Sequence, residues 1–125
     1  MTLLVLSVAG GVGAALRFLV DGFVARRNPF RIPLGTLLIN VTGSLGLGIL
    51  VGWATYGHGG TSADSLTAVL GTGLCGGYTT FSTAAVESMR LWFAEGPGPG
   101  GRYAATTLVG GVAAAFVGLA IGALL

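Results

Sequence analysis

Apolar residues fall into four long stretches that are separated by short segments rich in glycine, proline and arginine. The stretches cover residues 3–24, 33–56, 65–93 and 103–125, and each approaches the roughly 20 residues that cross a bilayer as a helix. The pattern predicts an all-α integral membrane protein with four transmembrane helices. The intervening segments are short enough to join neighbouring helices antiparallel: "RRNPFRIP", "GHGGTSAD" and "EGPGPGGR".

Composition supports a membrane environment and a single domain over residues 1–125. Mean hydropathy is +0.87 and 8% of residues are charged, whereas a soluble domain typically carries about 25% charged residues. The only cysteine is Cys75, so no disulfide can form within the chain. The only histidine, His58, falls in the second predicted loop, and no catalytic or cofactor motif is present. We therefore expect a protein that is not an enzyme.

The third stretch contains the segment "LCGGYTTFST", residues 74–83. A glycine pair weakens a helix, and non-helical backbone in a membrane is tolerated only where protein buries it or where it lines a cavity. We therefore predict that the third helix is broken near its middle, with freed carbonyls that can coordinate a small cation. The alternative is a glycine weak point that only bends the helix for packing, although the four hydroxyl residues that follow favour ion solvation: Thr79, Thr80, Ser82 and Thr83.

Three other residues within the stretches have both a structural and a functional interpretation. Asn40 either bonds a neighbouring helix or presents a donor to a polar pathway, because an unpaired amide in lipid is costly. Phe81 either packs or turns the positive edge of its ring toward an anion path. Arg17 either extends to the membrane interface or concentrates anions at a pore mouth.

Small residues recur at four-residue spacing along the second, third and fourth stretches. Such patterns allow helix backbones to approach closely in lipid, and we expect these faces to pack against another copy or a partner. The residues are Ser44, Gly48, Gly52, Gly73, Gly77, Gly118 and Gly122.

All six basic residues are arginine, and five of them flank the first and third predicted loops. The positive-inside rule then places these two loops in the cytoplasm and both termini outside. The five are Arg26, Arg27, Arg31, Arg90 and Arg102.

Three segments together resemble the CrcB/Fluc family of fluoride channels: "GGVGAALRF", "PLGTLLINVTGSLGLG" and "GLCGGYTTFSTAAVE", in this order along nearly the whole chain. The resemblance implies a dimer of four-span subunits in opposite orientations in the cell membrane. Fluoride would leave the cytoplasm passively, down its gradient, through two pathways between the subunits. It also implies a structural Na⁺ at the dimer centre, held by backbone carbonyls at positions matching Gly76 and Thr79.

The same resemblance implies roles for individual side chains. The vestibule or gating positions match Arg17 and Glu87. The expected partners are fluoride, membrane lipid and a second subunit, with no nucleic acid. The fluoride pathway positions match Asn40, Phe81, Ser82, Thr83, Tyr103 and Thr107.

Two features depart from the family pattern. Ala84 occupies the position of a second pore phenylalanine, one helical turn after Phe81. The arginine bias also favours one orientation, whereas an antiparallel homodimer needs a chain that inserts both ways. Both features favour a heterodimer with an oppositely oriented paralogue over a homodimer, and they keep open a non-conducting partner subunit. A small multidrug-type antiporter is the other alternative, but it needs an acid in the first span, where Asp21 lies only near the end.

Overall fold

The computed structural model describes residues 2–57 and 65–125, so His58 lies outside the described residues. These residues are almost entirely helical, as the sequence predicted. The elements in chain order are α1 (Thr2–Ala25), α2 (Leu34–Gly52), the π-helical η1 (Trp53–Gly57) and η2 (Ala68–Cys75), α4 (Gly76–Tyr78), α5 (Phe81–Glu95) and α6 (Pro97–Gly122).

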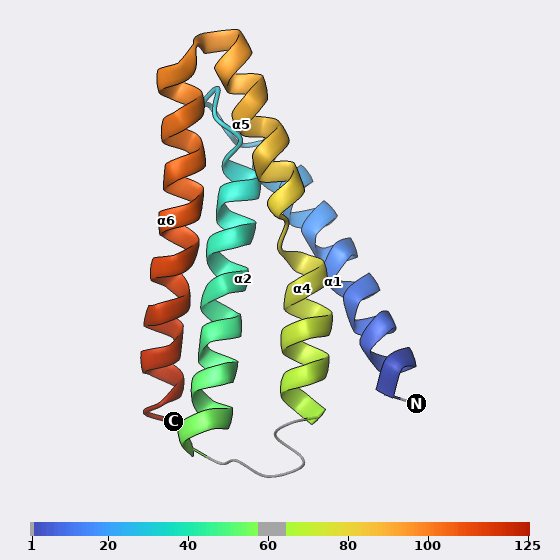
Figure 1. The fold of residues 1–125 in the computed structure, drawn as a ribbon. Coiled ribbons are helices and arrows are strands. Elements are labelled where there is room, and N and C mark those ends of the chain that lie inside the picture. Colours follow the sequence, from blue (N-terminus) through green and yellow to red (C-terminus); the bar gives the residue numbers. More distant parts are fainter. Residues whose placement is uncertain (1, 58–64) are drawn as a thin grey trace.

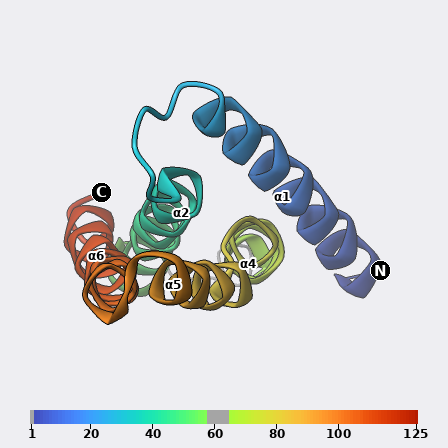
Figure 2. The same cartoon turned by 90° about the horizontal axis from the view of Figure 1, so that it is seen from above.

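The helices run alternately in opposite directions along the molecule and form two closely packed groups (Figure 1). In one group, α2 packs along α6; in the other, α1 packs along η2 and α4. Seen from above, α5 bridges the two groups by running from α4 to α6 (Figure 2). Both termini lie at one end of the molecule, opposite the α1–α2 connection and the α5–α6 turn (Figure 1). The arginine-rich first and third connections therefore share one end.

Among the described residues, three helices are long and apolar enough to cross a membrane: Leu3–Ala25, Leu34–Tyr56 and Pro97–Gly122. The third apolar stretch does not form one continuous helix, because Thr79 and Thr80 interrupt it. Thr79 has ψ 159° and Thr80 has φ −152° and ψ 117°, which are extended conformations.

The interruption lies two residues after the glycine pair that was expected to cause it. Gly76 and Gly77 are helical in α4, and the chain leaves the helix only after Tyr78. Gly77 instead serves close packing, since a Cβ atom there would overlap the carbonyl of Gly10 in α1. The two threonines break the helix because their side chains and neighbours offer the backbone other hydrogen-bond partners.

The last predicted loop is mostly helical, which corrects the expected start of the fourth helix. α6 begins at Pro97 rather than near Tyr103. Proline is favoured at the first turn of a helix because its missing N–H would have no partner there. Gly96 makes the reversal from α5 with φ 101°, a conformation that glycine adopts without strain.

The small residues at four-residue spacing pack within the chain rather than on a free face awaiting a partner. Cβ atoms at Gly48 and Gly52 would overlap α6 backbone, and Cβ atoms at Gly118 and Gly122 would overlap α2 backbone. The two helices therefore meet backbone to backbone along this seam, as expected for small residues in a membrane protein.

We expect Gly13→Ala to lower the stability of the protein, whereas Gly11→Ala in the same helix is tolerated. A Cβ atom at Gly13 would overlap the carbonyl of Leu74, but one at Gly11 has no atom within 4 Å. Overpacking of this kind costs about 1 to 3 kcal/mol, while alanine in an open helical position is favourable. Thermal unfolding in lipid nanodiscs measures the difference, and equal midpoints for the two variants would contradict the packing described for α1.

Candidate functional site

Asn40 holds the interruption of the third helical segment from the neighbouring helix α2. Its Nδ2 donates to the Thr80 carbonyl over 2.9 Å, and the Thr80 N–H donates to its Oδ1 over 2.8 Å. Gly43, one turn further along α2, brings the helix close to this point, because a Cβ atom there would overlap the Thr79 side chain. Both polar backbone groups of Thr80 are thereby paired within a segment that has no helical partner for them.

Arg17 reaches the interruption from the other side. It is half-buried on α1, and its guanidinium donates to the Thr79 carbonyl over 3.4 Å. The structure therefore directs Arg17 at the broken helix and not away from it toward the membrane interface. The Thr79 side chain bonds back into its own helix, where its hydroxyl donates to the Cys75 carbonyl over 2.9 Å.

The Thr80 hydroxyl caps the helix α5 that begins after the interruption. It accepts from the Thr83 N–H over 3.2 Å and donates to the Thr83 hydroxyl over 3.0 Å. The Ser82 hydroxyl lies 3.3 Å from the same oxygen. A threonine in this position satisfies one of the four N–H groups that a helix start leaves unpaired. Ser82 and Thr83 therefore stabilise the turn into α5 and do not line the groove described next.

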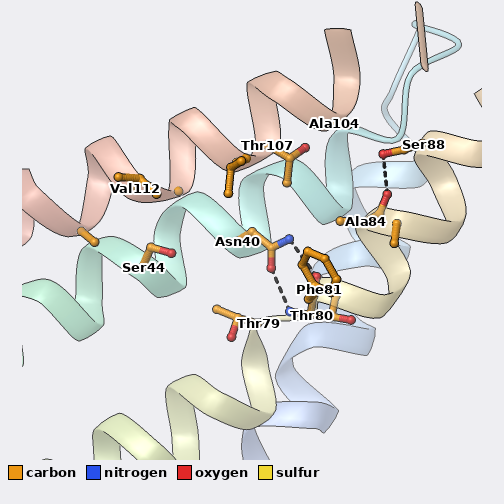
Figure 3. A pocket seen from close by; sticks show the side chains of 14 residues that line it. Asn40, Ser44, Thr79, Thr80, Phe81, Ala84, Ser88, Ala104, Thr107 and Val112 are labelled. Atoms are coloured by element: carbon orange, nitrogen blue, oxygen red, sulfur yellow. Dashed lines mark hydrogen bonds between the residues drawn. The ribbon is translucent and has the colours of Figure 1, made fainter. Parts of the chain in front are cut away.

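The interruption opens onto a groove of about 470 Å³ between α2, α5 and α6 (Figure 3). In the part of the chain that the structure describes, no charged side chain contributes to the lining, and the polar groups there are hydroxyls, one amide and backbone. Asn40, Thr79, Phe81 and Thr107, which the sequence singled out, all lie on it. The other lining residues are Ser44, Thr80, Ala84, Ala85, Ser88, Ala104, Leu108, Gly111, Val112 and Ala115.

Phe81 and Ala84 differ sharply in exposure within the single chain. The Phe81 side chain is 86% exposed and lies beside the interruption and Asn40 (Figure 3), whereas Ala84 is buried on the wall of the groove. A phenylalanine at position 84 would extend from this wall, so the small side chain leaves the groove wider. The exposed ring of Phe81 is a large apolar surface that the single chain leaves uncovered.

Among the described residues, two N–H groups beside the groove have no hydrogen-bond partner. A helix start leaves its first N–H groups unpaired, and no hydrogen bond between described residues uses those of Phe81 or Ser82. On the other side of the interruption, the Cys75 carbonyl keeps its bond from the Thr79 N–H, but the carbonyls of Gly76, Gly77 and Tyr78 accept no hydrogen bond from the N–H four residues ahead. The break therefore presents donors at one side and acceptors at the other.

Tyr103 and Glu87 form a second polar cluster, which lies near the start of α2 and does not line the groove. The Tyr103 hydroxyl lies 3.0 Å from a Glu87 carboxylate oxygen and 3.0 Å from the Pro33 carbonyl. Thr107, one turn along α6 from Tyr103, lines the groove and lies near the Tyr103 hydroxyl. The Thr107 hydroxyl is nevertheless buried without a hydrogen bond of normal geometry among the described residues.

Three polar groove residues were not singled out from the sequence as site residues. Thr80 was noted only as one hydroxyl in the "TTFST" segment, yet it is the residue that Asn40 holds. Ser44 and Ser88 also line the groove. The four-residue spacings from Asn40 to Ser44 and from Ala84 to Ser88 place each serine on the same helix face as a groove residue, which is the signal that was available.

Comparison with known proteins gives a consistent assignment. Residues 4–119 match the family described as CrcB-like protein, Camphor Resistance (CrcB). The chain is 46% identical to the fluoride-specific ion channel FluC 2 of Cutibacterium acnes over 122 residues, which are 98% of each chain.

Two further relatives match over shorter segments. FluC 1 of Leifsonia xyli is 46% identical over 59 residues, covering 47% of this chain and 42% of the relative. FluC 2 of Mycobacterium tuberculosis is 56% identical over 45 residues, covering 36% of each. Because the match to the family spans nearly the whole chain and the chain carries several membrane-crossing helices, this multi-pass membrane protein belongs to the CrcB-like family.

Proposed function

We propose that the chain is a subunit of a fluoride-specific channel that lets fluoride leave the cytoplasm passively, down its gradient. The observation that carries the proposal is the groove at the broken helix, whose largely apolar walls carry hydroxyls and one amide, in a chain 46% identical over 98% of its length to a fluoride-specific ion channel. Such a channel lowers the concentration of fluoride that enters as hydrogen fluoride and is trapped as the anion. The function requires no catalytic chemistry.

The groove suits a small anion that holds its water tightly. A pathway must replace hydration with hydrogen-bond donors and yet release the ion, which charged walls would prevent. Among the described residues, the N–H groups of Phe81 and Ser82 and the hydroxyl of Thr107 make no hydrogen bond of normal geometry, and the edge of the Phe81 ring carries partial positive charge. Arg17 adds a full positive charge nearby whose guanidinium is engaged by the Thr79 carbonyl, so it attracts anions without occupying their path.

In this proposal the third apolar stretch spans the membrane as η2, α4 and α5 together, which makes four spans. The arginine-rich end lies in the cytoplasm. The exposed Phe81 ring and the open side of the groove are covered by a second subunit in the opposite orientation. Ser82 and Thr83 then face the subunit boundary from the first turn of α5, where both are exposed in the single chain.

A structural Na⁺ fits the acceptors at the interruption. Backbone carbonyls are hard oxygen ligands of the kind that alkali cations take at broken helices. Gly76 has no side chain to cover its carbonyl, and the long contact from Arg17 leaves Thr79 a second lone pair. When bound between two subunits, the ion would supply a fixed positive charge at the centre. The chain's own contribution is to hold Gly76 and Thr79 on the accessible side of α4.

Glu87 and Tyr103 stand at the entrance nearer the α1–α2 connection. The shared contact with the Pro33 carbonyl ties α5, α6 and the start of α2 together at this end. We assign Glu87 a gating or vestibule role. We assign Tyr103 and Thr107 to the part of the fluoride pathway that continues along α6.

A proton-coupled multidrug antiporter fits this site less well. Such a transporter needs an acid in its substrate path, and none of the described residues that line the groove is acidic. Asp21 instead lies against Gly35 at the start of α2, where the helix dipole favours a negative charge.

The second candidate is a partner subunit that conducts only within a heterodimer, or completes another subunit's pore without conducting itself. Ala84 in place of an aromatic side chain and the one-sided arginines favour it. Relatives whose names are numbered FluC 1 and FluC 2 are in keeping with paired genes.

Liposomes that hold this chain alone should release fluoride and retain chloride. A fluoride electrode measures the release after a potassium ionophore removes the charge imbalance, and chloride-loaded liposomes are the control. Equal release of both ions would reject the proposed channel, and no release from protein shown to be folded would favour the second candidate.

Phe81→Ile should cut fluoride release about tenfold, because losing roughly 1 to 1.5 kcal/mol of ring-edge interaction in the barrier slows passage by that factor. Phe93→Ile is the matched control: Phe93 lies on the same helix, is 80% exposed and does not line the groove. If both variants release fluoride at the rate of the parent chain, Phe81 is not part of the pathway.

Co-reconstitution with a paralogue from the same genome separates the two candidate functions. A paired subunit should show little release alone and at least tenfold more when its partner is present, with both chains recovered in one complex. Full release by this chain alone, with no complex on co-expression, would exclude the heterodimer.

A further inference from the structure

We propose that Asn40 determines where the third helical segment breaks, by selecting the extended conformation of Thr80. The consequence of this role for fluoride passage rests on the proposed function, but the test, which is the conformation of Thr80, does not. It makes Asn40 a positioning residue that acts through the Thr80 backbone, in addition to its place on the groove wall.

The geometry of the contact carries the proposal. The Asn40 amide bonds the N–H and the carbonyl of one and the same residue, over 2.8 and 2.9 Å. These two groups point to the same side only when a residue is extended, as in the hydrogen-bonded pairs of an antiparallel sheet. In an α-helix they point in opposite directions along the axis. Thr80, with φ −152° and ψ 117°, has the one conformation that Asn40 can pair with twice.

The alternative conformation is a continuous helix, and Asn40 disfavours it. If Thr80 were helical, its N–H would bond the Gly76 carbonyl and the Asn40 amide would lose both partners. An unpaired amide within a membrane is costly. Gly43 adds a steric condition, because only a residue without Cβ lets α2 approach Thr79 closely enough for the amide to reach.

The break decides the positions of the groups used in the proposed channel. Thr79, whose carbonyl is a candidate ligand for the cation, stands immediately before Thr80, and Phe81 immediately after it. If Thr80 returned to a helix, the Gly76 carbonyl and the Phe81 N–H would each gain a hydrogen-bond partner within that helix. The Phe81 ring would also rotate. Asn40 thereby keeps the donors and acceptors of the break available.

The test is the conformation of Thr80 in Asn40→Ala and Asn40→Leu, read from its backbone chemical shifts and amide exchange by solid-state NMR in bilayers. We expect the ratio of extended to other conformations at Thr80 to fall roughly tenfold to a hundredfold, the effect of two net hydrogen bonds. The alanine variant removes the amide with the least change in packing. Ser44→Ala is the matched control, since Ser44 lines the same groove one turn along α2 and bonds no other described residue.

Fluoride release from the same samples separates positioning from direct binding. Loss of the extended signals at Thr80 in both Asn40 variants but not in Ser44→Ala, together with loss of release in the Asn40 variants, supports the proposal. Loss of release with the Thr80 signals unchanged would overturn it and leave Asn40 as a fluoride ligand only. The chemical shifts require no transport, so their outcome stands even if the parent chain releases no fluoride.

Discussion

A peptide segment that leaves the helix inside a membrane must find partners for its N–H and carbonyl groups, because lipid offers none. The stretch at Thr79 and Thr80 meets this requirement with side chains from two other helices. Asn40 on α2 pairs both groups of Thr80, and Arg17 on α1 approaches the Thr79 carbonyl. The interruption therefore ties three helices to one point, and their relative positions follow from it.

Close helix packing makes these contacts possible. Gly77 on α4 meets Gly10 on α1, and Gly13 meets the Leu74 carbonyl, so α1 lies near enough for Arg17 to reach Thr79. Along the other seam, glycines on α2 and α6 interlock and fix the face of α2 that carries Asn40. In lipid, where apolar surface gains little by burial, such backbone contacts are a main source of helix association. The many glycines thus serve the site as much as the fold.

The chemistry of the groove follows from the same arrangement. Ending α4 and starting α5 at one place brings unpaired acceptors and donors side by side, and the walls from α2 and α6 add hydroxyls without charge. Such a surface can exchange the water of a small anion for weaker partners and then release it. In the proposed channel, the exposed Phe81 ring and the small Ala84 leave the single chain an incomplete pathway. This incompleteness is the structural reason for assigning a second subunit, of either kind, to the proposed channel.

The sequence alone determined the membrane environment, the positions of the apolar stretches and the existence of an interruption in the third one. These features depend on the hydropathy and residue types of each segment alone, so they can be read without the fold. The order of the three motifs was sufficient to indicate the family. The sequence did not reveal which residues make the break, where α6 begins or what the spaced glycines face. Gly76 and Gly77 weaken a helix in isolation, but tertiary packing on α1 keeps them helical and moves the break to Thr80. Only the fold decided the position of the break, because the side chain that hydrogen-bonds an extended Thr80 belongs to Asn40, forty residues earlier in the chain.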